Sequence, residues 1–122
     1  MTTDLVTVAA GAASAKSMDP TVVIEVGDLI AITDYFVIAS GRNDRQVRAI
    51  AEEVERQVKV RSGAKPRQVE GLADAHWILM DYGDFVVHVF DEEAREFYDL
   101  EHLWSDAPRL AWEDLELAAD RG

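Results

Sequence analysis

The apolar patterns of this chain predict an α/β domain in which helices flank a mixed β-sheet. A buried strand is expected at residues 34–40, and the amphipathic helix after it, at 43–62, can return the chain for a parallel neighbour. Two strong strands, at 77–81 and 85–90, are joined by a tight loop at Tyr82-Gly83 and predict an antiparallel hairpin. The expected sheet therefore contains both parallel and antiparallel pairs.

The N-terminal third of the chain is expected to hold a helix and two strands. Residues 3–17 are rich in helix formers, and Asp19-Pro20 ends this segment because the residue before a proline avoids helical backbone angles. Residues 21–26 are mostly β-branched and apolar, as strands prefer. The run at 34–40 is apolar at consecutive positions, which suits a strand buried on both faces.

The helix at 43–62 carries its own start and stop signals. Asn43 can cap the first turn, and Gln46 stands three residues later, as in a capping box. Gly63 supplies a C-terminal stop, since glycine tolerates the left-handed conformation. Spacings of three and four residues place an apolar stripe on one side of the helix, formed by Val47, Ile50, Ala51, Val54 and Val58.

The rest of the chain is expected to hold the hairpin and a helical C-terminal part. A short strand at 67–70 precedes the hairpin, and one or two short helices follow it within 92–103. We divide the chain into a domain at residues 1–108 and an acidic C-terminal tail at 109–122, with a helix expected near 112–119.

The strong acidity of the chain limits its partners. It carries 24 acidic and 12 basic side chains, a formal net charge of −12. Such a domain repels phosphate backbones over about a Debye length, so we expect no broad nucleic-acid contact. A basic protein surface would be attracted, although net charge also serves solubility alone.

Composition also bounds the compartment. The chain has no cysteine, which excludes disulfides and thiolate metal sites. No apolar run approaches the roughly 20 residues that a membrane-spanning helix needs. The first five residues contain no basic side chain, so neither a secretory signal nor an Arg-rich transit peptide is expected. We expect a cytoplasmic protein without a membrane partner.

The search for catalytic motifs finds neither a P-loop nor a Gly-x-Ser-x-Gly elbow, and we predict no enzyme, metal or cofactor. Asp81 and Asp84 flank the hairpin turn and could hold a cation with His88, but aspartate is common in turns for its own hydrogen bonds. Ser40-Gly41 after a buried strand is similar to the Gly-Ser turn of nucleotidyltransferases. Those enzymes need two carboxylates on a following strand, and residues 67–70 offer one.

The hairpin and the segment after it are the better candidates for a binding surface. Side chains alternate across a strand, so both faces of the hairpin are largely apolar and both need a cover. The long helix is one cover, and the N-terminal helix or another protein is the other. The segment at 95–104 then brings together Arg, Tyr and Trp, the residue types that dominate interface hot spots. The competing interpretation is that Phe97, Leu100 and Leu103 close the core.

An ordered series of motifs resembles the ribosome-silencing factor (Iojap) family over nearly the whole chain, from about Met1 to Pro108. The series comprises Ile32–Gly41, Arg45–Ala51, Val69–Gly71, Ala75–Asp84, Val86–Phe90 and Arg95–Trp104. The resemblance implies a nucleotidyltransferase-like topology without catalytic residues. It implies binding to the large ribosomal subunit through large-subunit ribosomal protein fourteen, which blocks joining with the small subunit and represses translation. It also implies a homodimer.

The resemblance suggests which residues bind the partner. Trp77 and Tyr98 would be the anchors, while Arg95 and Glu101 would supply charged hydrogen bonds. The full expected set is Trp77, Asp81, Tyr82, His88, Phe90, Arg95, Tyr98, Leu100, Glu101 and Trp104. Two alternatives stay open, a nucleotide-binding enzyme of the same topology and a homo-oligomeric scaffold.

Overall fold

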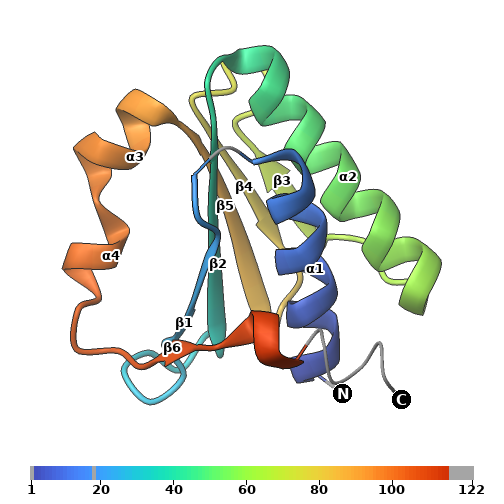
Figure 1. The fold of residues 1–122 in the computed structure, drawn as a ribbon. Helices are drawn as coiled ribbons and strands as arrows, with labels where there is room; N and C mark the ends of the chain where they lie inside the picture. The colour runs from blue at the N-terminus through green and yellow to red at the C-terminus, as the bar shows by residue number, and fades with distance from the viewer. Residues whose placement is uncertain (1, 18, 116–122) are drawn as a thin grey trace.

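The computed structural model describes residues 2–17 and 19–115, which form one six-stranded sheet with helices on both faces (Figure 1). The strands lie in the order β3-β4-β5-β2-β1-β6. In chain order the elements are α1 (Thr2–Lys16), β1 (Val22–Glu25), β2 (Tyr35–Gly41), α2 (Asp44–Ser62), β3 (Gln68–Glu70), β4 (Trp77–Asp81), β5 (Phe85–Asp91), α3 (Glu92–Tyr98), α4 (Leu100–Leu103) and β6 (Arg109–Leu110).

The sheet is mixed, as predicted. β2 and β5 run parallel from Tyr35↔Phe85 to Gly41↔Asp91, and the helix α2 lies between them in the chain. The β4–β5 hairpin, β3–β4, β1–β2 and β1–β6 are antiparallel. Because β2 and β5 stand at the centre, their side chains are covered from both sides.

One face of the sheet is covered by α1 and α2 (Figure 1). The apolar stripe predicted for α2 is buried here, against inward-facing side chains of β2, β4 and β5 such as Val37, Ile78 and Val87. The α1 side contributes mainly small residues, including Ala9 and Ala13, which lets the two helices pack closely. This layer is mostly aliphatic, with Phe85 and Trp112 as its buried aromatic side chains.

Both ends of α2 are built as the sequence predicts. Asn43 Oδ1 accepts from the Gln46 N–H at 2.9 Å. The Gln46 side chain reaches back to the Arg42 N–H at 2.6 Å, one residue before the position a standard capping box uses. Gly63 adopts φ +76° and ends the helix.

The opposite face carries α3 and α4, which form a bent arm rather than a long helix (Figure 1). Asp99 separates them with φ +46°, a left-handed conformation that ends α3, and its backbone N–H donates to the Arg95 carbonyl. Leu100 and Ala94 are buried against Ile24, Ile38 and Phe90 of the sheet.

The segment expected to be an acidic tail begins with β6, which pairs with β1 at Val23↔Leu110. Trp112 is buried, and its indole N–H donates to the Thr21 carbonyl at 2.9 Å. Residues 112–115 are helical, and the rest of the helix expected near 112–119 lies outside the described residues. Through residue 115 this segment therefore packs on the domain. No helix in the described ranges is long and apolar enough to cross a membrane.

Candidate docking face

The predicted anchors lie on the sheet face that carries α3 and α4. Six rings meet there and are called the aromatic face below: Phe36, Trp77, His88, Phe90, Tyr98 and Trp104. Strand alternation aims them to the same side, since Trp77 pairs with Phe90 and Ile38 pairs with His88 across neighbouring strands. Three strands and the α3–α4 arm therefore build one surface.

Trp77 is the centre of the aromatic face. Its ring lies 5.0 Å from Phe90 and 4.7 Å from Tyr98, centroid to centroid. Its indole N–H donates to His88 Nδ1 at 3.0 Å, which fixes the orientation of the half-buried ring. Trp77 is thus held in one orientation, and such preorganisation would suit the anchor role expected from the sequence, because it reduces the entropy that binding costs.

His88 acts as a structural support of this surface. Burial lowers its pKa to about 4, so the imidazole is neutral at physiological pH. Because Nδ1 accepts from Trp77, the proton sits on Nε2. Nε2 is buried and has no hydrogen-bond partner among the described residues, while the Phe36 ring lies edge-to-face at 4.6 Å.

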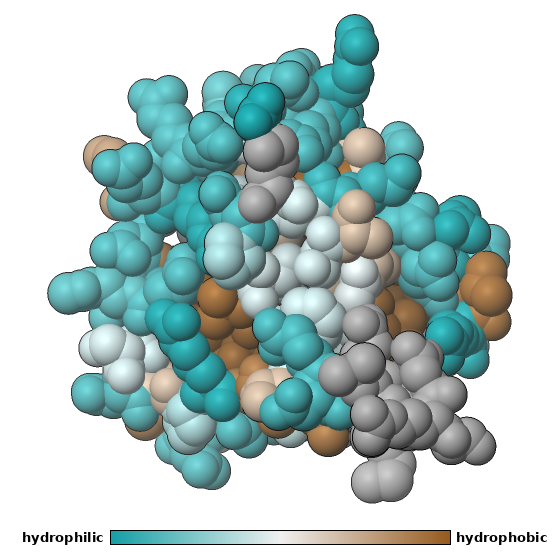
Figure 2. All heavy atoms as spheres, in the orientation of Figure 1, coloured by the Kyte–Doolittle hydropathy of each residue, from teal (hydrophilic) through white to brown (hydrophobic). Residues whose placement is uncertain are grey.

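The α3–α4 arm beside the aromatic face exposes apolar side chains to solvent. Phe97, Tyr98 and Leu103 of the arm are 79%, 48% and 69% exposed. Trp104 is half-buried and meets Phe36 edge-to-face at 5.7 Å. Figure 2 shows hydrophobic atoms in a recess over β1, between α4 and α1, with hydrophilic residues around it. Exposed apolar groups gathered in this way are typical of binding surfaces.

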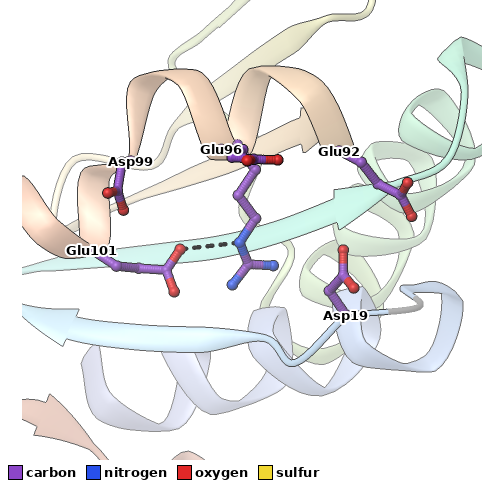
Figure 3. Close-up of a pocket in the computed structure, with 6 residues that line it drawn as sticks. Asp19, Glu92, Glu96, Asp99 and Glu101 are labelled. Atoms are coloured by element: carbon purple, nitrogen blue, oxygen red, sulfur yellow. Dashed lines mark hydrogen bonds and ion pairs between the residues drawn. The ribbon is translucent and has the colours of Figure 1, made fainter.

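Arg95 and Glu101 lie beside the aromatic face as a partly buried ion pair. Arg95 Nε donates to Glu101 Oε1 at 3.0 Å, the dashed line in Figure 3. The recess around them is also lined by Asp19, Glu92, Glu96 and Asp99. Both members of the pair therefore serve contacts inside the chain.

Asp81 and Tyr82 occupy different positions from the other candidates. Asp81 Oδ1 accepts from the Gly83 N–H at 2.8 Å and supports the hairpin turn, where Gly83 adopts φ +88°. Tyr82 stacks on Phe85 at 4.8 Å and packs against the aliphatic core on the α2 side. Burial and, to a smaller extent, the charge of Glu55 raise the pKa of Tyr82 to about 12. Tyr82 thus belongs to the opposite face.

The structure adds residues that sequence reasoning missed. Phe36 alternates with Ile38 and Ser40 along β2, and that alternation was the available signal. Leu100 fits the interpretation that the arm closes the core, whereas Phe97 and Leu103 point to solvent and do not.

The residues considered for a cation site and for nucleotidyltransferase chemistry have structural roles in the fold. Of the three side chains suggested for a cation, Asp81, Asp84 and His88, Asp81 accepts a hydrogen bond within the turn and His88 accepts one from Trp77. Within residues 2–17 and 19–115 there is no cluster of three or more potential metal ligands. The Ser40 hydroxyl is buried, donates to Asp19 Oδ2 at 2.8 Å and accepts from Arg95.

Charge is divided between the two faces. Residues 91–106, which include the α3–α4 arm, hold seven acidic side chains and one basic side chain. Residues 42–67, which include α2, hold four acidic and eight basic side chains. The aromatic face is therefore bordered by negative charge.

Comparison with known proteins gives consistent matches along the chain. Residues 1–122 match the family described as "Ribosomal silencing factor during starvation". The chain is 40% identical over 101 residues to the ribosomal silencing factor RsfS of Bacillus subtilis, covering 83% of this chain and 85% of that protein. It is 36% identical over 86 residues to a mouse protein named "Mitochondrial assembly of ribosomal large subunit protein 1", covering 68% of this chain and 37% of that protein.

Two crystal structures share the fold. A protein from Chromobacterium violaceum has a TM-score of 0.77 and 28% identity, with 84% of each chain covered. A protein from Bacillus halodurans has a TM-score of 0.73 and 34% identity, with 88% of this chain and 96% of that chain covered. With the full-length family match, these findings confirm the resemblance: the chain belongs to the ribosomal silencing factor (RsfS) family, whose members silence ribosomes without acting as enzymes.

Proposed function

We propose that this chain represses translation in the cytoplasm by binding the large ribosomal subunit through its aromatic face. The contact on the ribosome is large-subunit ribosomal protein fourteen, and the bound domain blocks joining with the small subunit. The observation that carries the proposal is the exposure of Phe97, Tyr98 and Leu103 on the arm, whose Tyr98 contacts a rigidly held Trp77. The mouse relative, named for assembly of the ribosomal large subunit, supports the choice of subunit.

The physical properties of the surface fit such a partner. Apolar rings at the centre with charged groups at the rim are the usual anatomy of a protein interface. The rim is acidic, so a basic ribosomal protein would be attracted and its encounter rate raised. A footprint of roughly 800 Å² on each partner is enough for specific binding. Exclusion of the small subunit then needs occupancy alone and no reaction.

The fold itself would be a nucleotidyltransferase-like scaffold that lacks catalytic groups. Ser40 stands after a buried central strand, where such an enzyme would place its turn. Here its hydroxyl is engaged by Asp19 and Arg95, which supports a binding role for the scaffold.

Co-sedimentation with purified large subunits tests the proposal. We expect Tyr98→Ala and Leu103→Ala to reduce binding by about tenfold or more, as loss of an interface hot spot does. The matched control is Leu72→Ala, because Leu72 is also exposed but lies in the β3–β4 loop held to α2 by Arg48. In subunit-joining assays, Tyr98→Ala and Leu103→Ala should likewise inhibit joining less than Leu72→Ala does.

Two outcomes would contradict the proposal. Wild-type protein that does not sediment with large subunits removes the ribosomal role. Binding by Leu103→Ala and Tyr98→Ala that equals the binding of Leu72→Ala removes the aromatic face as the docking surface, even if the ribosomal role stands.

A second copy of the chain is the alternative occupant of this face. The same exposed rings could pack in a homodimer, which would have to dissociate before binding a ribosome. Light scattering of wild type and Leu103→Ala separates the cases, since a dimer built on this face becomes monomeric in the variant. A dimer that persists in Leu103→Ala uses another surface.

A further inference from the structure

The Arg95 side chain makes three hydrogen bonds on the α3–α4 side of the sheet. Nε donates to Glu101 Oε1 at 3.0 Å, one terminal nitrogen donates to Ser40 Oγ at 3.0 Å, and the other donates to the Pro20 carbonyl at 2.9 Å. The side chain is only 14% exposed. Its charge is therefore directed into the chain and away from solvent.

These three contacts join segments that are far apart in the sequence. Arg95 lies on α3, Glu101 on α4, Ser40 on the central strand β2 and Pro20 in the connection from α1 to β1. The link continues inward, because the Ser40 hydroxyl donates to Asp19 Oδ2 at 2.8 Å. Ser17 Oγ also donates to the Ser40 carbonyl, at 2.8 Å. The Arg95 guanidinium therefore connects the α3–α4 arm to β2 and to the α1–β1 connection.

The arm needs such a tie because its own structure is weak. α4 is four residues long, and the left-handed Asp99 interrupts the helical hydrogen bonds before it. The arm is held to the sheet by packing of Ala94, Leu100 and Trp104, by the contact of Tyr98 with Trp77, and by the Arg95 hydrogen bonds. Among these, the Arg95 hydrogen bond to Glu101 joins α3 to α4 across the bend. The exposed side chains that the proposed function needs, Tyr98 and Leu103, lie on the two sides of this bend.

We infer that Arg95 is a positioning residue for the aromatic face, with Glu101 as its partner across the bend, and that neither side chain contacts the ribosome. This inference rests on the proposed docking of the aromatic face and revises the roles that the family resemblance suggests for both residues. Arg95 fixes where α4 lies, and through α4 it fixes the spacing of Tyr98 and Leu103.

Arg95→Lys separates positioning from direct contact. Lysine keeps the positive charge, but a single ammonium cannot reach three acceptors arranged for the planar fork of a guanidinium. A side chain that acted on the partner only through its charge would tolerate the change. A positioning residue would not, so we expect binding to large subunits to fall by about tenfold or more.

Hydrogen exchange gives a readout that is independent of the ribosome. The amides of His102, Leu103 and Trp104 donate to carbonyls at Asp99 and Leu100 and should exchange faster in Arg95→Lys. The amides of α2 should keep wild-type exchange, because α2 lies on the other face of the sheet. A general loss of stability would instead accelerate both groups.

Glu101 supplies the reciprocal test. Glu101→Gln keeps an acceptor oxygen for Arg95 Nε and should bind within about threefold of wild type, whereas Glu101→Ala should show faster α4 exchange and weaker binding. The control is Glu96→Gln, which removes a carboxylate from the same recess without touching the Arg95 contacts. If Arg95→Lys does not fold, α4 exchange and binding are compared between Glu101→Ala and wild type instead. Arg95 keeps its contacts with Ser40 and Pro20 in Glu101→Ala, so this variant is expected to fold.

The outcomes separate this inference from the proposed function. Wild-type binding by Arg95→Lys, or weaker binding with unchanged α4 exchange, overturns the positioning role. Unchanged α4 exchange in both Arg95→Lys and Glu101→Ala overturns it as well, whatever the ribosome assay gives. If wild-type protein does not bind large subunits, the proposed function fails. Faster α4 exchange in the variants would still support the role of Arg95 in positioning α4.

Discussion

The two faces of the sheet are built on different principles. The face under α1 and α2 is mostly aliphatic, and residues such as Ile50 and Val54 are fully buried by long elements of the same chain. The other face is aromatic, is covered by a short bent arm, and leaves Phe97 and Leu103 in solvent. Burial on the first face stabilises the fold, whereas incomplete burial on the second leaves apolar area for a partner.

Truncation of the aliphatic core should have the largest effect on stability. Ile50→Ala removes a fully buried side chain from α2 and should lower the free energy of unfolding by about 2–5 kcal/mol. Val60→Ala on the same helix is the control, since exposed Val60 should change stability by less than about 0.5 kcal/mol. Urea unfolding followed by circular dichroism measures both. If Ile50→Ala and Leu103→Ala lower the free energy of unfolding by similar amounts, the two faces do not differ in their contribution to stability as described.

Acid should weaken the aromatic face through His88. Its folded pKa is about 4 and its ordinary value is 6.5, so the unfolded chain takes up the proton first as pH falls. The contribution of His88 is complete above pH 6.5 and is lost between pH 6.5 and about 4, by roughly 3 kcal/mol.

Urea unfolding at several pH values, compared between wild type and His88→Gln, isolates this contribution. The glutamine amide oxygen can accept from the Trp77 indole N–H but does not titrate. The wild type should lose more stability than the variant between pH 6.5 and 4. Parallel curves would show that His88 does not titrate in this way.

Asp81 supports the hairpin turn that joins β4 to β5, from which the aromatic face is partly built. Asp81→Ala removes the acceptor for the Gly83 N–H and should lower stability by about 1 kcal/mol. Asp81→Asn keeps an acceptor oxygen and should stay close to wild type. Weaker ribosome binding by Asp81→Asn at unchanged stability would give Asp81 a docking role in addition to the turn.

His76 should give the smallest effect, with the opposite sign to His88. The hydrogen bond that His76 Nδ1 donates to the Asp91 carboxylate, at 2.6 Å, raises the pKa of His76. Its contribution is complete below the ordinary value of 6.5 and is lost as pH rises through the folded pKa. His76 is exposed, so the effect is small and screened by salt. NMR titration of the imidazole in wild type and Asp91→Asn checks the direction, and an unchanged pKa in the variant would contradict it.

Local patterns made most of the elements predictable. The apolar stripe of α2, the cap at Asn43 and the stop at Gly63 depend on neighbours within one helix, and the structure confirms them. The β4–β5 hairpin is also local, and its strands begin where alternation places them. The predicted anchors Trp77 and Tyr98 lie together because the hairpin leads directly into α3.

Other features of the fold depend on contacts that no local pattern encodes. β6 is two residues long and follows Pro108, so it shows no alternation, and its pairing with β1 depends on residues about ninety positions away. Tyr82 sits in the turn, where the strand period no longer decides which face a side chain joins. The inward aim of Arg95 depends on Ser40 and Pro20, which the sequence cannot place beside it.

The division of charge between the arm and α2 gives the molecule an electric dipole across the sheet. In the field of a positive surface such a body feels a torque, which turns its negative side toward that surface during diffusion. Encounters would then begin with the aromatic face forward more often than random collision allows. The same torque weakens as added salt shortens the reach of the field, so productive collisions would become rarer before the bound complex itself loosens.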